Sequence, residues 1–317
     1  MAEGKRNSIK VLGSRFLDWA ERLIRAVIYI SGWSSILFVA AIFFFIFKEA
    51  APILPSVDWG KFFFENRWIP NPAEGNEAHY GAAGIVYGTF AITVVSMLIA
   101  MPLGFAAAVY ISEFATGKVK ETLKVLIELL AAIPSIIWGF IGLVIMGPII
   151  QKLFNVEVGV NLLNASLMVA FMAIPLIVSI SEDALRAVPD SYREAALALG
   201  ASKWEIVYKV LFPAAKNGLL AAAMLGVGRA VGETMAVWMA SGGTENIPKA
   251  GEVANFSFLL ERVKAMTATI ASEMKDTAHG DEHYMMLFVI GIVLLLICVF
   301  INVVSDLVIK GIKKKNS

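Results

Sequence analysis

The sequence predicts an all-α integral membrane protein with six transmembrane helices. Hydrophobic residues make up 58% of the 317 residues, charged residues make up only 17%, and the mean hydropathy is +0.72. A soluble domain carries roughly 45–50% apolar and about 25% charged residues, so this chain is too apolar for a water-soluble globule. The formal net charge of +1 provides no global field that would attract nucleic acid, and no nucleic-acid partner is expected.

Six stretches are long and apolar enough to cross a bilayer. A spanning helix needs about 20 apolar residues, because a hydrocarbon core of roughly 30 Å is divided by a rise of 1.5 Å per residue. The predicted spans are residues 26–47, 84–111, 125–150, 162–180, 218–240 and 285–309. The first is too long for a typical signal peptide and is expected to be retained. Pro102, Pro134 and Pro175 predict kinks within their spans.

The permease domain, residues 26–309, is flanked by two basic tails, 1–25 and 310–317. In the first tail, Leu12, Phe16, Ala20 and Leu23 recur at helical spacing between basic residues. This pattern suits an amphipathic helix on the inner leaflet, and a flexible basic tail is the equal alternative.

The distribution of Lys and Arg predicts the orientation in the membrane. Eighteen of these cations lie in the two tails and in the second-to-third and fourth-to-fifth connections, and eight lie in the remaining connections. Because cytoplasmic segments carry the excess of Lys and Arg, both termini are expected in the cytoplasm of a cell with the chain in its inner membrane. Segments 48–83 and 241–284 are then extracytoplasmic loops or short helices.

The cytoplasmic segment 182–216 is predicted to be helical. It contains two Ser-x-x-Glu capping boxes, in which each side chain satisfies a backbone N–H at the start of a helix. A glycine suited to ending the first helix and a proline expected to stop the second complete the pattern. In chain order these residues are Ser191, Glu194, Gly200, Ser202, Glu205 and Pro213. The expected structure is a short helix, a tight turn and a second helix.

This segment resembles the EAA loop of binding-protein-dependent ABC importer permeases. Glu194-Ala195-Ala196, Gly200 and Pro213 carry the resemblance, although Val210 and Phe212 depart from the usual Ile and Leu. It implies a type I ABC importer (MetI-like) architecture, in which the first helix docks in a groove of a cytoplasmic ATPase. The residues assigned to ATPase coupling are Arg193, Glu194, Ala195, Ala196, Leu199 and Gly200. An ordinary capped helix-turn-helix loop is the alternative.

The fifth predicted span carries two charges. Arg229 and Glu233 are four residues apart, which places them on one face of a continuous helix. A charge near mid-bilayer costs roughly 2.5–3.5 kcal/mol unless it faces protein or water. We expect Arg229, Glu233 and Thr234 to line a substrate pathway, with the guanidinium binding an oxyanion and the carboxylate favouring a protonated one. A purely structural ion pair is the alternative, and Gly228 and Gly232 predict close helix packing.

The stretch 228–237 resembles the PstC family of phosphate-importer permeases, and so do residues 68–72, 133–139 and 267–273. The resemblance implies phosphate as substrate and membrane lipid as surroundings. It also implies a second, PstA-like permease as heterodimer partner, a PstB-like ATPase pair and an extracytoplasmic PstS-like phosphate-binding protein. The alternatives are another oxyanion such as sulfate or molybdate, the A-type subunit, a membrane-embedded phospho-lipid enzyme, or a passive anion channel.

No catalytic or metal site is predicted in this chain. A Gly-rich phosphate loop followed by Lys-Ser or Lys-Thr is missing from the sequence, so ATP and magnesium are expected to bind the partner ATPase and no cofactor is expected here. His279 and His283, with neighbouring Asp281 and Glu282, are interpreted as solvated loop residues. The lone Cys298 lies in an apolar run and excludes an intramolecular disulfide.

Overall fold

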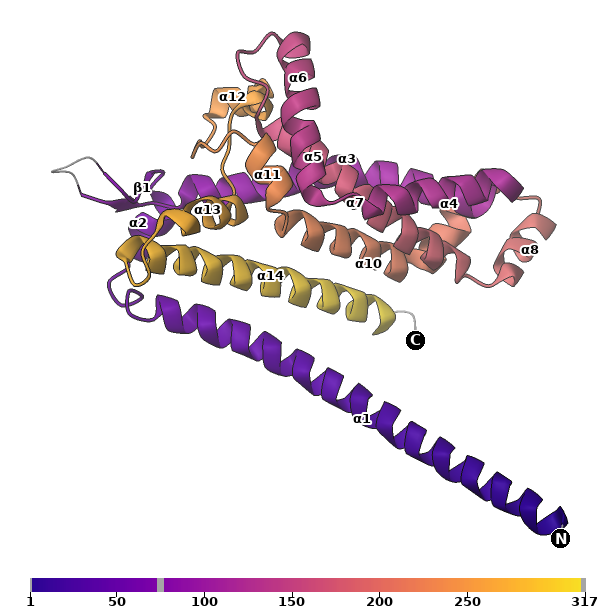
Figure 1. The fold of residues 1–317 in the computed structure, drawn as a ribbon. Helices are drawn as coiled ribbons and strands as arrows, with labels where there is room; N and C mark the ends of the chain where they lie inside the picture. The colour runs from indigo at the N-terminus through magenta and orange to yellow at the C-terminus, as the bar shows by residue number, and fades with distance from the viewer. Residues whose placement is uncertain (1, 73–76, 315–317) are drawn as a thin grey trace. The chain divides into compact units, whose positions relative to one another are not determined.

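The computed structural model describes residues 2–72 and 77–314, and this part of the chain is helical apart from loops and one two-stranded hairpin (Figure 1). Strand β1, Trp68–Ile69, pairs antiparallel with β2, His79–Tyr80. Six helical segments in the described residues are long and apolar enough to cross a membrane, which confirms the predicted fold class. The chain divides into two units, Met1–Pro52 and Ile53–Ser317.

The first unit is a single helix, α1, Ala2–Ala50. Its candidate span is Glu21–Ala50, so the predicted tail and span form one continuous helix. No proline interrupts it. Side chains such as Trp33 and Phe44 are each 71% exposed within this chain. An apolar surface of this extent requires lipid or another protein to cover it. The expected amphipathic face of residues 12–23 falls largely outside the described side chains.

The second unit is built around α3, Ala83–Val109, α7, Leu162–Arg186, and α10, Phe212–Val231, with α14, Glu282–Lys314, packed on α10. Small residues bring the first three helices together. A Cβ at Gly104 of α3 would lie 2.7 Å from the Ile177 side chain of α7, and one at Gly226 of α10 would lie 2.9 Å from it. Pro102 and Pro175 lie inside α3 and α7 without ending them.

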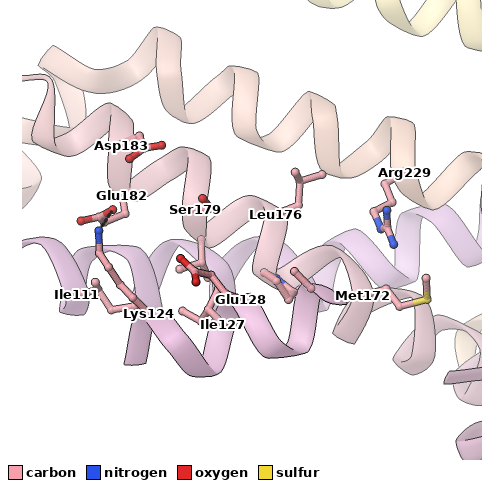
Figure 2. A pocket seen from close by; sticks show the side chains of 13 residues that line it. Ile111, Lys124, Ile127, Glu128, Met172, Leu176, Ser179, Glu182, Asp183 and Arg229 are labelled. Carbon is pink, nitrogen blue, oxygen red and sulfur yellow. Dashed lines mark hydrogen bonds and ion pairs between the residues drawn. The ribbon is translucent and has the colours of Figure 1, made fainter. Parts of the chain in front are cut away.

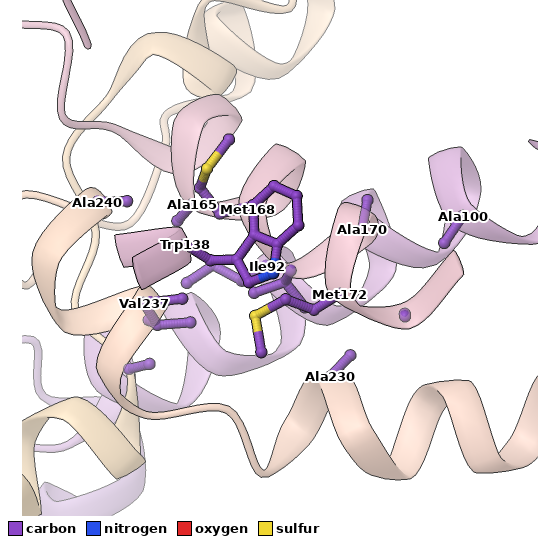
Figure 3. Packing of buried hydrophobic residues seen from close by; sticks show 14 of the residues in the cluster. Ile92, Ala100, Trp138, Ala165, Met168, Ala170, Met172, Ala230, Val237 and Ala240 are labelled. Atoms are coloured by element: carbon purple, nitrogen blue, oxygen red, sulfur yellow. The ribbon is translucent and has the colours of Figure 1, made fainter. Parts of the chain in front are cut away.

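A buried apolar cluster joins these helices to the break in the fifth span (Figure 3). Trp138 of α5, Ser135–Ile141, stacks on Phe171 of α7, with ring centroids 5.8 Å apart. Ile92 of α3, Ala230 of α10 and Val237 of α11, Met235–Ala240, belong to the same cluster. Two segments of one span therefore share one core, and this holds the non-helical residues between them in place.

The third predicted span, 125–150, is divided. Helix α4, Gly117–Ala132, ends before Pro134, and the candidate span is Ser135–Phe154, which comprises α5, Ser135–Ile141, a π-helical segment Gly142–Met146, and α6, Gly147–Phe154. Pro134 ends α4 instead of kinking it, because proline disfavours helical backbone at the preceding residue; Ile133 is extended, with ψ 121°. Helix α4 has no buried residue and is a separate element.

The fifth predicted span, 218–240, is shifted. The helix begins with α9, Lys203–Glu205, continues through a π-helical segment, Ile206–Leu211, and ends with α10 at Val231. Pro213 does not stop it. In the π-helical turn Phe212 N–H donates to Val207 O, five residues back, so the ladder is already shifted where proline lacks a donor. Residues 232–234 are not helical, and α11 follows.

The segments predicted to be extracytoplasmic, 48–83 and 241–284, contain short helices as well as loops. These are α2, Trp59–Phe64, α12, Ala250–Ala254, α13, Met266–Glu273, and 3-10 turns at Ser257–Leu260 and Met274–Asp276. Helix α13 lies at the opposite end of the bundle from α8, Asp190–Ala198 (Figure 1).

Candidate functional site

The EAA-like loop has the predicted helix, turn and second helix. Gly200 follows α8 with φ +78°, and a Cβ there would meet nothing within 4 Å, so this position favours glycine for its backbone conformation. The second capping box is confirmed: Glu205 N–H donates to Ser202 Oγ at 3.3 Å, and Ser202 N–H donates to Glu205 Oε2 at 3.0 Å. The first box is wrong, because α8 begins at Asp190 and its N-cap is Pro189, with Ser191 already inside the first turn.

The residues assigned to ATPase coupling divide between two faces of α8. Glu194, Ala195, Leu199 and Gly200 are exposed, and Leu199 is 89% exposed. Ala196 is buried in an apolar cluster with residues of α3, α7 and the π-helical segment Ile206–Leu211. The exposed face is therefore available to a partner, whereas the buried face fixes α8 to its own bundle.

Arg193 is directed into the bundle, and its side chain is 18% exposed. Its Nη2 donates to Glu113 Oε1 at 2.9 Å and its Nε donates to Glu113 Oε2 at 3.2 Å, which makes a bidentate ion pair. The remaining bonds go to Leu185 O in the last turn of α7, to Val188 O in the linker that follows, and to Asp190 Oδ1. The five N–H donors of the guanidinium thus have five acceptors.

A cavity of about 410 Å³ lies between α4, α7 and α10 (Figure 2). Arg229 lies at one end of it, and Lys124 with Glu182 lies at the other. Lys124 Nζ is 2.9 Å from Glu182 Oε2, and Arg186 Nη1 is 3.4 Å from Glu182 Oε1. Glu182 is thereby paired with cations, and two further carboxylates, Glu128 and Asp183, line the same cavity. Arg229 forms no ion pair with any of the described residues.

Arg229 and Glu233 do not share a helical face, and that expectation is wrong. Helix α10 ends at Val231, Gly232 caps it, and Glu233 lies in the break that follows. Arg229 is exposed toward the cavity, and Glu233 is 8% exposed. No ion pair joins these two residues in the part of the chain that the structure describes, so the structural-pair alternative loses its geometric basis.

Contacts from α11 and α13 hold Glu233 in the break. Ala236 N–H in the first turn of α11 donates to Glu233 Oε1 at 3.4 Å, and Thr267 Oγ1 of α13 donates to Glu233 O at 2.8 Å. Thr234 Oγ1 donates to Gly232 O at 3.3 Å. Glu233 and Thr234 therefore lie just beyond the end of α10 that carries Arg229, where α10, α11 and α13 meet.

Gly228 and Gly232 are exposed in this single chain. A Cβ at Gly228 would meet nothing within 4 Å, and one at Gly232 would meet only backbone oxygens of its own helix. The predicted close packing thus has no counterpart within the described residues. Together with Arg229, these glycines form an open surface of α10, which we name the glycine face.

Sequence reasoning missed a buried charged cluster at the α13 end of the bundle. Glu273 accepts hydrogen bonds from Trp68 Nε1 at 2.8 Å and Lys264 Nζ at 2.6 Å, and it lies 2.8 Å from His283 Nε2. Lys264 also binds Glu245 at 3.0 Å. His283 is 7% exposed, so its interpretation as a solvated residue is wrong. Its position two residues before the predicted span 285–309 was a usable signal.

Burial acts to raise the pKa of Glu273, but hydrogen bonds from Lys264 and Trp68 outweigh it and the pKa is lowered. Glu273 is therefore a carboxylate that ties β1, α13 and the start of α14 together. No group of three or more His, Cys, Asp or Glu residues with metal-binding geometry occurs among the described residues.

The fold defines the class of the protein. A chain of a solved bacterial alginate ABC transporter superposes with a TM-score of 0.56 at 14% identity, covering 87% of this chain and 94% of that one. A chain of the inward-facing MetNI methionine ABC transporter gives a TM-score of 0.52 at 22% identity, covering 73% and 94%. Likeness at this identity shows that the fold is that of an ABC importer permease.

The sequence profile of the family described as binding-protein-dependent transport system inner membrane component matches residues 100–314, and the chain belongs to this family. It is 36% identical over 253 residues to the protein named probable ABC transporter permease protein YqgH of Bacillus subtilis (strain 168), covering 79% of this chain and 75% of that one. It is 31% identical to the phosphate transport system permease protein PstC of Pasteurella multocida, covering 86% and 89%. It is also 32% identical to PstC of Haemophilus influenzae, covering 79% and 81%.

Family membership and the six apolar helices define a multi-pass inner-membrane subunit of an ABC importer. Such a subunit implies a partner permease, an ATPase and a substrate-binding protein.

Proposed function

We propose that this chain is a permease subunit of an ATP-driven importer of inorganic phosphate. The likeness to two PstC proteins at 31% and 32% identity over most of the chain carries the substrate class. The position of Arg229 at the cavity end supports it, because a guanidinium offers a permanently charged planar fork that suits a tetrahedral oxyanion.

The proposed pathway contains Arg229, Glu233 and Thr234. Glu233 is held as a hydrogen-bond acceptor beside the first turn of α11, and its carboxylate lies one helix end from Arg229. Hydrogen phosphate keeps a proton that it can donate to such an acceptor, whereas sulfate at neutral pH has none. A pathway that offers a cation and then a carboxylate acceptor therefore favours a protonated oxyanion.

The proposed assembly uses two exposed surfaces, the outer face of α8 and the glycine face of α10. The exposed face of α8 docks on a PstB-like ATPase, which binds ATP and magnesium, and the glycine face packs against a PstA-like permease. Both termini lie in the cytoplasm, and a PstS-like phosphate-binding protein delivers substrate at the α13 end. The exposure of Leu199 and the open space beside Gly228 support these two interfaces.

The test is uptake of radiolabelled phosphate by the complete complex in liposomes, with and without ATP, and with sulfate and molybdate as competitors. We expect ATP-dependent uptake that the competitors do not reduce and that Arg229→Gln lowers. Lys152→Gln removes a charge of α6 outside the cavity and serves as the control. Uptake of sulfate or molybdate in place of phosphate would refute the substrate. Uptake without ATP would indicate a channel, and failure to transport any oxyanion would favour the phospho-lipid enzyme.

A further inference from the structure

The cytoplasmic end of the proposed coupling path contains a joint between elements that are distant in sequence. Arg193 of α8 and Glu113, in the π-helical segment Tyr110–Phe114 that ends α3, are 80 positions apart and form a bidentate ion pair. Ser112 Oγ donates to the same carboxylate at 2.8 Å. The side chains of Arg193 and Glu113 are only 18% and 14% exposed, so solvent screens this pair little.

The same guanidinium also binds the end of α7. It satisfies the carbonyls of Leu185 and Val188, which belong to the last turn of α7 and the linker to α8. Helices α7 and α8 are joined covalently through this linker, but α3 is not. Burial of Ala196 beside Ala108 and Val109 of α3 already favours contact, and the bidentate ion pair adds a directional link that fixes the orientation of Arg193 relative to Glu113. Arg193 is thus positioned to make α3 follow α8 in both directions.

At its other end, α3 is bonded to the element that holds Glu233. Met266 N–H at the start of α13 donates to Thr89 Oγ1 of α3 at 2.9 Å, and a Cβ at Gly88 would lie 2.2 Å from Lys264 O. The next residue of α13, Thr267, donates to Glu233 O at 2.8 Å. A chain of direct contacts therefore runs from α8 through α3 and α13 to Glu233.

We propose that the Arg193–Glu113 pair is the joint through which movement of α8 is transmitted to α3, and that α3 through α13 sets the position of Glu233 in the pathway. Arg193 and Glu113 are positioning residues, and Arg193 acts inside the permease instead of by contact with the ATPase. This inference rests on the proposed function, because it assigns the ATPase contact to α8.

The first test is a double-mutant cycle in the complete complex, with ATP hydrolysis and phosphate uptake measured together. Glu113→Gln keeps the shape and removes the charge, and Arg193→Lys keeps the charge and removes the fork. We expect each variant to lower the phosphate transported per ATP hydrolysed by about tenfold, in the usual range of coupling between sites. The double variant should be no worse than the more impaired single variant, because both remove one interaction.

Lys209→Gln is the matched control. Lys209 forms an ion pair with Glu205 at 2.9 Å in the helix that follows the turn at Gly200. Both side chains are exposed and belong to this one helix, so the pair does not link two helices. We expect the transported phosphate per ATP to be unchanged in this variant. Equal losses of hydrolysis and uptake in the Arg193 and Glu113 variants, or losses that multiply in the double variant, would overturn the joint.

The second test does not depend on the substrate. In a Cys298→Ser background, Met235→Cys places a single thiol two residues after Glu233, at a side chain that is 38% exposed. We expect ATP with vanadate to change the rate at which a membrane-impermeant maleimide labels this thiol. Glu113→Gln should abolish this change, although ATP hydrolysis measured separately without vanadate should persist in that variant. The inference would be contradicted if ATP with vanadate still changed the labelling rate in Glu113→Gln. It would also be contradicted if the labelling rate did not change in the protein that keeps both Arg193 and Glu113. Failure of phosphate uptake alone would refute the proposed substrate and leave this labelling result decisive.

Discussion

Arg229 and Glu233 are divided by the end of α10: the guanidinium reaches the cavity from the last turn, and the carboxylate lies in the non-helical break beyond Gly232. The break has its own supports, since α11 and α13 each contribute a hydrogen bond to Glu233. Cation and carboxylate are thus attached to different elements. Their separation can change when α10 moves relative to α13, which a single continuous helix would not allow.

Replacing Arg229 separates the role of its charge from the role of its geometry. Hydrogen bonds to charged groups contribute about 1.5–3 kcal/mol, so Arg229→Gln should lower kcat/KM for phosphate uptake by roughly 10–100-fold. Arg229→Lys should fall between Gln and the unmodified protein, because it keeps the charge but loses the fork. Initial rates of uptake in liposomes measure both. A Lys variant as impaired as the Gln variant would show that the charge alone contributes nothing.

Thr267→Val should destabilise the non-helical segment 232–234 between α10 and α11. Its hydroxyl donates to Glu233 O, and Thr267 is 8% exposed, so removal of the donor leaves a buried carbonyl unpaired at a cost of about 1–3 kcal/mol. We expect a lower Tm and faster labelling of a thiol at position 235. Ser272→Ala is the control, since Ser272 Oγ donates to Thr269 O within the same helix and links no second element among the described residues. Equal Tm values for the two variants would show that the hydrogen bond from Thr267 to Glu233 O does not stabilise this segment.

The cluster around Glu273 should make stability depend on acid pH. The folded pKa of Glu273 lies below its ordinary value of 4.5 because Lys264 and Trp68 bind the carboxylate. A lowered folded pKa stabilises the folded state fully above the ordinary value, and this stabilisation is lost as pH falls through the folded pKa. Thermal unfolding in detergent between pH 3 and pH 7 should show a loss of Tm below about pH 4.5. In Glu273→Gln this part of the loss should vanish, and Glu128→Gln should retain it.

Gly200→Ala should impair assembly without a steric clash. The φ of +78° costs a non-glycine residue about 1–2 kcal/mol, although the space around the position is open. We expect less ATPase to co-purify with the variant. Gly251→Ala also enters open space, but its backbone is outside the left-handed region, so its yield of complex should match that of the unmodified protein. Similar losses in both would point to a general folding effect.

Local chemistry made several elements predictable from the sequence. Apolar length determined the six spans, and the Ser202–Glu205 box and Gly200 determined the turn after α8, because each depends on residues only a few positions apart. Pro134 and Pro213 show the limit of this reasoning. Proline ended α4 where the preceding residue became extended, but it left the fifth helix intact where a π-helical turn had already shifted the hydrogen bonds.

Only the tertiary structure decided where the charges of the site act. Arg193 lies in the segment whose sequence pattern predicts a docking helix, yet its ion-pair partner is Glu113, 80 positions away. Glu273 and Trp68 are 205 positions apart, and Thr267 and Glu233 are 34 apart. Sequence spacing determines which side chains are neighbours within one helix, but contacts between helices depend on how the helices pack against one another. For this reason the sequence by itself determined the membrane fold and the helix and turn around Gly200, and the packing of α3, α8 and α13 decided what holds Glu233.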